Sequence, residues 1–321
     1  MQFSPDLLNQ CWFLAGPTAC GKSAVGLELA ELIDAEIVSL DSMSLYRGMD
    51  IGTDKPSPED RRRVPHHLID VIDPHEEFSL AEYVEAAEKV CRTIVSRNRV
   101  PLFVGGTGLY LRGILRGVFD GPAADWEFRR TCEQQAQNNG PDFLHKQLQK
   151  VDPDSAETLH RNDTRRLIRA LEVFHLTGKP LSEQQQQSPL PPEQQPQHVY
   201  WLNPSRDRLY ERINHRVQRM MEQGLLDEVR MLLWANKKPI SRTARQALGY
   251  KEAIDFLNED FGLDELVNLI QTRTRQFAKR QHTWFRNLQE CRPIDVTRDE
   301  SPAEVAKRIR TIAKLSILDE C

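Results

Sequence analysis

Long apolar runs are missing from this sequence. The most apolar stretches, such as VPLFVGG at residues 100–106, are far too short to cross a bilayer. Residues 1–14 have no basic segment ahead of their apolar residues, so they lack the pattern of a signal peptide. We therefore expect a cytoplasmic protein that has no membrane partner.

Cysteine is scarce and scattered along the chain. The six cysteines are Cys11, Cys20, Cys91, Cys132, Cys291 and Cys321. None belongs to a C-x-x-C pair or has a histidine at zinc-site spacing, which argues against a zinc site or a disulfide framework and favours a reducing compartment. Cys20 lies in a tight, glycine-bounded turn, where a small residue is a simpler explanation than a redox role.

The chain also lacks an excess of positive charge. It has 43 Lys and Arg against 47 Asp and Glu, for a net charge of −4. A nucleic acid would therefore have to be bound by local basic surfaces and not by the overall field of the protein. With 321 residues, 39% hydrophobic and 28% charged, the chain has room for one large domain or two smaller ones.

The first third of the chain alternates apolar strands with amphipathic helices. Strands are predicted at residues 11–16, 36–41 and 100–106, with helices at 22–33 and 80–97 between them. This alternation is typical of an α/β fold with a parallel sheet, in which ligands bind at the C-terminal ends of the strands. Three such ends carry polar clusters: the loop after the first strand, DSMSLYRG at 41–48 and GGTGLY at 105–110.

The pattern changes at about Asp120. Polar-rich helices follow with no strand between them, and they end in the Gln/Pro-rich stretch EQQQQSPLPPEQQPQ at 183–197, which cannot pack a core. A strand is predicted again at 198–204, and long helices come after it. We therefore predict a parallel α/β core formed by residues 1–118 and 199–321, interrupted by a helical insertion at 119–198, with no internal repeat.

A phosphate-binding motif follows the first strand. FLAGPTACGKSAVGLELA at 13–30 contains G-x-x-x-x-G-K-S, which falls on Gly16, Gly21, Lys22 and Ser23. In such a loop the backbone N–H groups and the start of the next helix face an anion. Lys22 would reach the outer phosphates and the Ser23 hydroxyl would bind Mg²⁺. The motif leaves open whether these phosphates belong to ATP or to another compound.

The other two polar strand ends add a carboxylate and a flexible turn. Asp41 could bind Mg²⁺, accept a proton from a substrate or cap a turn. Three polar strand ends beside a phosphate loop favour a functional role. In GGTG, the glycines Gly105, Gly106 and Gly108 let the backbone approach a ligand and Thr107 offers a hydroxyl, although this pattern is weak by itself.

Two basic clusters lie outside the strand ends. RTRQFAKRQHTWFRNL at 273–288 has five Lys or Arg and no acid. Helical spacing puts Arg275, Lys279, His282 and Arg286 on one face and Phe277, Trp284 and Leu288 on another. A solvated face over a core stripe would explain this pattern, but the uninterrupted positive charge favours contact with a polyanion. RNDTRRLIR at 161–169 clusters Arg165, Arg166 and Arg169 in the same way.

The adjacent histidines His66 and His67 could suggest a metal site. Neighbouring side chains on a strand point in opposite directions, and no carboxylate lies at ligand spacing. We therefore predict a structural or hydrogen-bonding role for both.

Six motifs occur in a fixed order, namely GPTACGKS, DSMSLYRGMDIGTDKP, HHLID, GGTGLY, RQALGYKE and TRQFAKRQHTWFR. Over nearly the whole chain this series resembles the bacterial tRNA dimethylallyltransferases of the IPP transferase family. The resemblance implies a P-loop NTPase-like core and makes the phosphates those of dimethylallyl diphosphate, not of ATP. It also implies transfer of a dimethylallyl group to N6 of adenosine 37 of tRNA, next to the anticodon, with release of diphosphate.

The resemblance further implies the site residues. The diphosphate would be bound by Gly16, Pro17, Thr18, Ala19, Cys20, Gly21, Lys22 and Ser23, with Mg²⁺ at Ser23. Asp41 would be the general base, and Lys22, Thr107 and Arg216 would act on the phosphates. The tRNA would contact Asp41, Ser42, Met43, Ser44, Thr107, Arg129, Arg165, Arg166, Leu167, Ile168, Arg169, Arg245, Gln246, Ala247, Leu248, Gly249, Tyr250, Arg275 and Lys279. The insertion would hold the anticodon stem-loop, and we expect a monomer.

The sequence departs from the family pattern in two places. Ser44 stands where the family usually has Gln, so the base contact from this position is not implied. The zinc finger that eukaryotic relatives carry at their C-terminus has no counterpart among these motifs.

Three alternatives use the same phosphate loop. A small-molecule kinase would bind ATP, but it would need neither the insertion nor the basic distal helix. An adenylate isopentenyltransferase would act on a free nucleotide, which offers no anticodon stem for the basic insertion to hold. An RNA-binding module with a vestigial loop would not need intact Lys22, Ser23 and Asp41.

Overall fold

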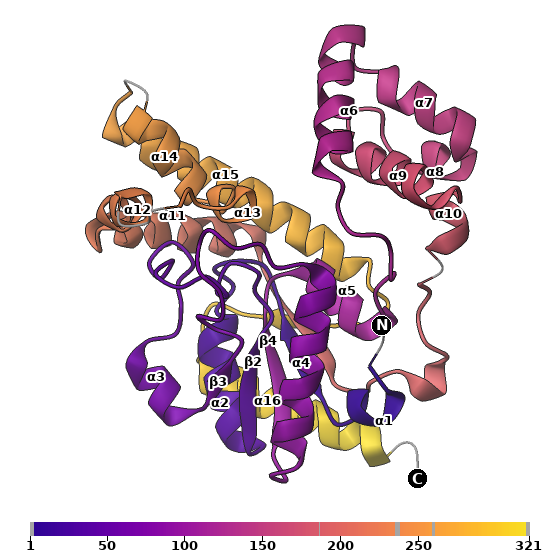
Figure 1. Cartoon of the computed structure of the whole chain (residues 1–321). Coiled ribbons are helices and arrows are strands. Elements are labelled where there is room, and N and C mark those ends of the chain that lie inside the picture. Colours follow the sequence, from indigo (N-terminus) through magenta and orange to yellow (C-terminus); the bar gives the residue numbers. More distant parts are fainter. Residues whose placement is uncertain (1–2, 186, 235–237, 259–260, 319–321) are drawn as a thin grey trace. The chain divides into compact units, whose positions relative to one another are not determined.

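The computed structural model describes residues 3–185, 187–234, 238–258 and 261–318, and the chain forms two compact units (Figure 1). The core unit comprises Gln2–Arg116 and Pro189–Cys321, and the helical unit comprises Gly117–Ser188. The insertion was predicted at 119–198, so the helical unit ends earlier than expected. The Pro-rich residues from 189 onward belong with the core unit because they lead directly into its next strand.

The core unit is built around one six-stranded sheet in which every pairing is parallel, with the order β3-β2-β4-β1-β5-β6. The strands are β1 Trp12–Ala15, β2 Ala35–Ser39, β3 His66–His67, β4 Val100–Gly105, β5 Val199–Pro204 and β6 Arg292–Val296. β1, β2, β4 and β5 are almost entirely buried, as expected for the centre of a parallel sheet that helices cover. The apolar runs predicted these four strands. The edge strand β6 is mostly exposed and has no apolar run, so it was not predicted.

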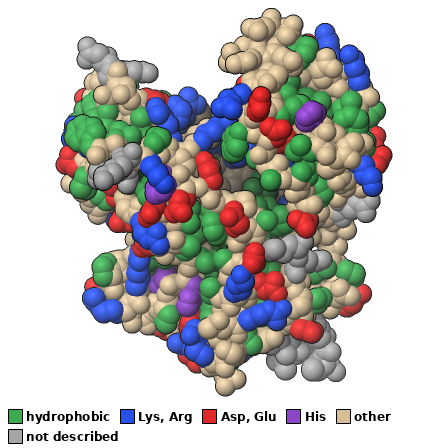
Figure 2. Space-filling model, viewed as in Figure 1, with side chains coloured by type: hydrophobic (Ala, Val, Ile, Leu, Met, Phe, Trp, Pro, Cys, Tyr) green, Lys and Arg blue, Asp and Glu red, His purple; other side chains and the backbone are tan. Residues whose placement is uncertain are grey.

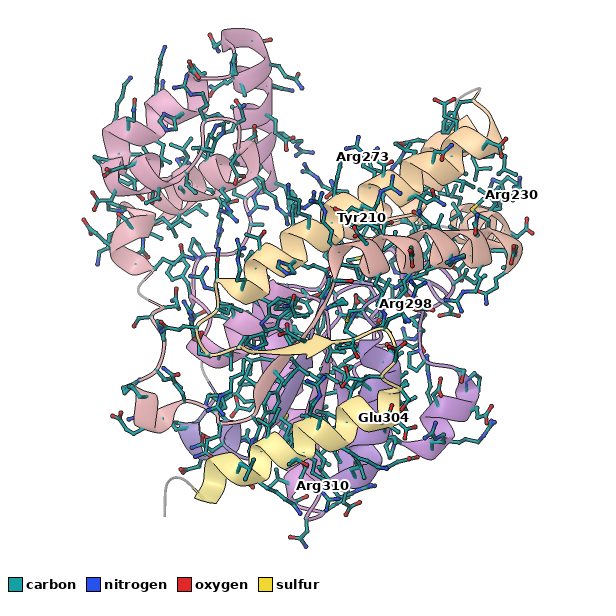
Figure 3. All side chains as sticks on the ribbon, turned by 180° about the vertical axis from the view of Figure 1, so that it is seen from behind. Tyr210, Arg230, Arg273, Arg298, Glu304 and Arg310 are labelled. Carbon is teal, nitrogen blue, oxygen red and sulfur yellow. The ribbon has the colours of Figure 1, made fainter. Side chains whose placement is uncertain are left out.

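Helices of the core unit cover the sheet and extend beyond the C-terminal ends of its strands. They are α1 Pro5–Leu8, α2 Lys22–Leu32, α3 Pro58–Arg63, α4 Leu80–Val95, α5 Gly108–Arg116, α11 Arg206–Glu222, α12 Leu225–Trp234, α13 Arg242–Arg245, α14 Tyr250–Asn258, α15 Leu263–Arg286 and α16 Pro302–Leu318. α2 and α16 pack together against sheet residues such as Leu14, Ile37 and Leu102. α11 and α15 run side by side (Figure 3), and a side chain of each contacts Thr18 of the phosphate loop.

The helical unit contains α6 Trp126–Asn139, α7 Phe143–Val151, α8 Pro153–Thr158, α9 Thr164–Thr177 and α10 Leu181–Gln184. Aspartates cap the two longest of these helices, Asp125 on α6 and Asp163 on α9. The unit has its own small core, in which Cys132, Leu148 and Leu167 are buried. It therefore packs as a separate body of helices.

Charge and hydropathy agree with the composition. Figure 2 shows acidic and basic side chains interspersed over the face of the core unit that it presents. None of the described helices is long and apolar enough to cross a membrane. Cys11, Cys20, Cys91, Cys132 and Cys291 are free and buried, and Cys321 lies outside the described residues.

Candidate active site

A cavity of about 410 Å³ lies in the core unit at the C-terminal ends of β1, β2 and β4. This volume is in the ordinary range for small-molecule sites. The predicted motifs meet in its wall, although they are far apart in the sequence. The lining includes Thr18, Lys22, Ser23, Asp41, Ser42, Met43, Ser44, Gly105, Thr107, Arg216, Gln246, Ala247, Leu248, Gly249, Phe277, Arg280 and Gln281.

The phosphate loop leaves its helix start open to an anion. α2 begins at Lys22, and its N-cap, Gly21, adopts φ +96° and has no side chain to occupy the first N–H groups. Lys22 Nζ lies 3.4 Å from the carbonyl oxygen of Pro17 and has no carboxylate partner among the residues described. Within this loop, Gly16, Pro17 and Cys20 are buried. Burial raises the pKa of the Cys20 thiol more than Lys22 lowers it, so this thiol stays protonated.

A glutamine from α15 ties the phosphate loop to the GGTG turn. The N–H of Thr18 donates to Gln281 Oε1 at 2.8 Å, and Gln281 Nε2 donates to the carbonyl of Gly106 at 2.8 Å. The Thr18 amide is therefore occupied within the protein, and the Cys20 amide donates to the carbonyl of Pro17 at 3.3 Å. The amides of Ala19, Gly21 and Ser23 are the part of the loop left to an anion. The sequence analysis missed Gln281, although a glutamine side chain within the buried stripe of a helix indicates a buried hydrogen-bonding role.

Asp41 sits in a closed turn between β2 and the cavity. Its Oδ1 accepts the N–H of Met43 at 2.9 Å, so the capping role that the sequence left open is present. The N–H of Ser42 donates to Thr107 Oγ1 at 3.1 Å, which joins this turn to the GGTG turn. Ser44 is buried, with its side chain at the cavity wall. Asp41 therefore caps its turn and also lines the cavity.

Arg216 reaches the phosphate loop from α11. It donates to Thr18 Oγ1 at 2.8 Å and lies 3.5 Å from the carboxylate of Asp54. One turn earlier on the same helix, Arg212 Nε donates to the carbonyl of Ala19 at 2.7 Å. The sequence pointed to Arg216 only through the family resemblance, and it did not point to Arg212 or Asp54.

The RQALGYKE segment contributes backbone and small side chains to the wall. Gln246 to Gly249 line the cavity, and Arg245 is exposed. Tyr250 is only 1% exposed, and its hydroxyl donates to Glu228 at 2.5 Å. The structure therefore gives Tyr250 a partner inside the protein, and Glu228 is a second residue that sequence reasoning missed.

The basic helix α15 uses its cations in different ways. Arg275 donates to Asn214 Oδ1 at 2.7 Å, and His282 is 3.0 Å from Asn203 Oδ1, so these two face the core unit. Lys279 and Arg286 are exposed, and Arg273 extends from the helix into solvent (Figure 3). The predicted basic face is thus half packed and half exposed.

The apolar stripe of α15 also differs from the prediction. The buried side chains are Leu266, Ile270, Thr274, Ala278, Gln281 and Phe285. Phe277 and Trp284 are half-buried: Phe277 lines the cavity and Trp284 packs against Gly108. The prediction covered residues 273–288 alone, where the buried positions of the helix are Thr274, Ala278, Gln281 and Phe285; Leu288, just beyond the helix, is buried as predicted.

In the helical unit, two predicted tRNA contacts have internal partners. Arg129 makes paired bonds to both oxygens of Glu172, at 2.7 and 2.8 Å, and Arg169 adds a third at 2.6 Å. Burial would raise the pKa of Glu172, but the hydrogen bonds from these two arginines outweigh it and lower that pKa. Leu167 and Ile168 are buried in the core of the unit.

The neighbouring arginines of the same helix lie at the surface. Arg165 and Arg166 are exposed, and Arg166 lies 3.4 Å from Asp163. The basic run on α9 thus divides into an exposed first turn and a packed second turn.

The histidine pair has the predicted hydrogen-bonding roles. His66 Nδ1 lies 2.7 Å from the carbonyl of Val64, and His67 Nε2 lies 2.6 Å from Glu36. Burial, with a further contribution from the charge of Arg61, lowers the pKa of His66. His66 lines the cavity and is neutral at pH 7.

Oxygen donors for Mg²⁺ are present at the cavity. The Ser23 hydroxyl is exposed there and the Asp41 carboxylate lines the same wall. Mg²⁺ in phosphate sites is typically held by one or two such oxygens together with the phosphates of the ligand, so this donor set fits the ion. Among the described residues, the one cluster of three acid or histidine side chains is Asp73, His75 and Glu76, which does not include either donor.

Known proteins are similar to this chain in sequence and in structure. A family model described as IPP transferase matches residues 44–288. A tRNA dimethylallyltransferase of Geobacter metallireducens is 48% identical over 275 residues, which cover 86% of this chain and 89% of that protein. Another, of Carboxydothermus hydrogenoformans, is 44% identical over 301 residues, which cover 94% of this chain and 96% of that protein.

Two solved structures of such enzymes are also similar to this chain over nearly its whole length. The full-length tRNA isopentenylpyrophosphate transferase of Bacillus halodurans has a TM-score of 0.68 at 37% identity, covering 98% of this chain and 100% of its own. A eukaryotic dimethylallyltransferase acting on tRNA has a TM-score of 0.76 at 27% identity, covering 96% of this chain and 79% of its own.

Proposed function

This chain belongs to the IPP transferase family, and we propose that it transfers the dimethylallyl group of dimethylallyl diphosphate to N6 of adenosine 37 of tRNA. The observation that carries this proposal is the meeting of the phosphate loop, Asp41 and the RQALG segment in one cavity. A diphosphate would lie at the loop, with the acceptor base beside Asp41.

The donor end of the cavity suits a departing diphosphate. An allylic diphosphate ionises readily because its cation is delocalised, so catalysis consists mainly of stabilising the negative charge that leaves. The amides of Ala19, Gly21 and Ser23, the ammonium of Lys22 and the guanidinium of Arg216 all supply positive potential there. The Ser23 hydroxyl would hold Mg²⁺, which when bound adds positive charge at the diphosphate.

The acceptor end offers one carboxylate at the cavity wall. The exocyclic N6 amine is a poor nucleophile, and Asp41 would remove its proton as the new C–N bond forms. The N–H of Met43 fixes one carboxylate oxygen, which orients the group. The adenine has to leave its stack to reach a site this enclosed, so we propose that the nucleotide is flipped out of the anticodon loop.

The tRNA would be held outside the cavity by exposed cations and by the helical unit. Arg165, Arg166, Arg245 and Lys279 are exposed and could contact phosphates. Arg129 and Arg169 would support that surface through Glu172. We further propose that the protein is a cytoplasmic monomer.

The test is direct: incubate the purified protein with dimethylallyl diphosphate, Mg²⁺ and unmodified tRNA, and digest the tRNA for mass spectrometry of its nucleosides. We expect N6-dimethylallyl adenosine without added ATP. Lys22→Ala should slow product formation roughly 10²-fold or more because it removes charge from the leaving diphosphate. Lys89→Ala, an exposed lysine on α4, is the matched control. A strict requirement for ATP would overturn the donor assignment and favour a kinase.

A further inference from the structure

One wall of the cavity is held by a buried carboxylate on α12. Glu228 is 6% exposed and accepts three consecutive backbone N–H groups: from Asp50 at 3.0 Å, Ile51 at 2.8 Å and Gly52 at 3.3 Å. Its fourth donor is the Tyr250 hydroxyl at 2.5 Å. No Lys or Arg lies within ion-pair distance of it in the described part of the chain. A buried carboxylate without a cation depends on all of these donors.

The tyrosine also fixes the loop by its shape. The Tyr250 ring lies so close to Gly52 that a Cβ at position 52 would overlap it. Lys55 fixes the far end of the same loop, because its ammonium bonds to Asp50 and to Asp70 at 2.7 Å each. The backbone of residues 50–55 is therefore held at both ends.

This loop leads to the phosphate-binding groups. Gly52, Thr53 and Asp54 line the cavity. The Asp54 carboxylate lies 3.5 Å from Arg216, whose guanidinium donates to Thr18 of the phosphate loop. A continuous set of contacts thus joins Glu228 to the groups that would meet the diphosphate.

We propose that Glu228 and Tyr250 are positioning residues for prenyl transfer: they hold the loop at 50–52 so that Asp54 orients Arg216 toward the diphosphate. The inference rests on the proposed function for its substrate. Neither residue touches the donor in this scheme. They act by fixing the direction of a guanidinium that does, and preorganised charge of this kind is what stabilises a leaving anion.

Two substitutions separate the contributions of Glu228 and Tyr250. Glu228→Gln keeps the volume but replaces an acceptor oxygen by an NH₂ group, which cannot accept the N–H groups it faces. We expect kcat/KM for the donor to fall about 10- to 100-fold, with tRNA affinity within about twofold. Tyr250→Phe keeps the ring under Gly52 and removes one hydrogen bond, so we expect a loss of about three- to tenfold. Glu85→Gln, at an exposed position of α4, is the matched control and should change nothing.

A double-mutant cycle tests the route through Asp54. If Glu228 acts by placing Asp54 on Arg216, Tyr250→Phe and Glu228→Gln should lose most of their effect on donor kinetics in an Asp54→Ala background. Fully additive effects, or a change in melting temperature with donor kinetics unaltered, would overturn the proposal.

A second readout does not depend on turnover. Binding of inorganic pyrophosphate to the full chain should weaken in Tyr250→Phe and Glu228→Gln by the same factors as the donor kinetics. Unchanged pyrophosphate affinity would overturn the positioning role of Glu228 and Tyr250. Failure of the wild-type protein to make the prenylated nucleoside would count against the proposed function instead.

Discussion

Glu172 of the helical unit and Glu228 of the core unit are both buried, and their hydrogen bonds are satisfied in opposite ways. Glu172 in the helical unit is fully buried, with two arginines and the N–H of Asp125 on its oxygens. Glu228 in the core unit has three amides and a phenol, and no cation in the part of the chain that the structure describes. The first carboxylate neutralises charge, and the second shapes a loop.

The same contrast separates the arginines around Glu172 from the cations at the cavity. In the helical unit, Arg129 and Arg169 form ion pairs with the buried carboxylate of Glu172. In the core unit, Lys22 and Arg216 face a cavity, and Arg216 lies 3.5 Å from the carboxylate of the exposed Asp54. Charge that is neutralised internally stabilises a fold, whereas charge left facing a cavity is available to a ligand.

The largest expected effect is at the chemical centre of the core unit. Asp41→Asn keeps an oxygen to accept the N–H of Met43, so the turn survives, but it removes the base. We expect the single-turnover rate to fall by about 10²- to 10⁴-fold, with tRNA affinity within a few-fold. Rapid quench with saturating tRNA measures this rate, and Asp207→Asn, at an exposed position of α11, is the control. A variant that keeps a tenth of the rate would leave Asp41 with its capping role alone.

The second prediction concerns the glutamate of the helical unit. Glu172→Gln leaves two arginines without their counter-charge. Removing one partner of a buried pair costs about 3–5 kcal/mol, and because both arginines are partly exposed we expect about 2–4 kcal/mol here. Native-state hydrogen exchange should show this loss in α6 and α9 and not in β1 or β4. Glu127→Gln, exposed on α6, is the control. An equal loss in both units would mean that they do not open separately.

Acid should also distinguish the two units. Burial, with a smaller contribution from Arg292, lowers the pKa of His198 to about 4. A histidine held neutral contributes stability above its ordinary pKa of about 6.5, and this is lost as the pH falls toward 4. Glu172 has a lowered pKa, so its contribution persists until the pH falls below its ordinary value of about 4.5.

Between pH 6.5 and 4.5, the core unit should therefore lose roughly 2 kcal/mol through His198 while the Glu172 contribution stays intact. Hydrogen exchange corrected for intrinsic rates would measure both units, and His198→Gln should reduce the loss in the core unit. If the helical unit weakens first, the assignment of acid sensitivity is wrong.

The sequence predicted most of the core unit because its signals are local. Apolar strand runs, the phosphate loop and the polar strand ends each lie within about ten residues, and their meeting at one sheet edge follows from parallel topology. Strand β6 escaped because an exposed edge strand needs no apolar run.

Partners distant in the chain could not be predicted. Glu228 meets residues 50–52, and Gln281 meets Thr18, across separations that no local pattern encodes. One signal was available and overlooked: Glu172 follows Arg169 by three residues on a helix, which is the spacing of an ion pair. A run of arginines in a sequence predicts a basic surface only after the nearby acids are counted.

The smallest expected effect is on tRNA affinity, and it depends on that distinction among arginines. Arg165 and Lys279 are exposed, and no ion pair is seen for them among the described residues. Each would therefore contact phosphate at no internal cost. Arg165→Ala and Lys279→Ala should each raise the tRNA Kd by about three- to tenfold and lower the slope of log Kd against log salt by about one. The saturating single-turnover rate and the melting temperature should not change.

Arg169→Ala supplies the comparison, and Arg298→Ala, an exposed arginine of the core unit (Figure 3), supplies the control. Because Arg169 bonds to Glu172 and to the carbonyl of Pro122, its removal should destabilise the helical unit. Its effect on Kd should then follow the population of opened α9, not a lost phosphate contact. A full unit of salt slope lost in Arg169→Ala, with unchanged hydrogen exchange in α9, would show that this internally paired arginine reaches the RNA after all.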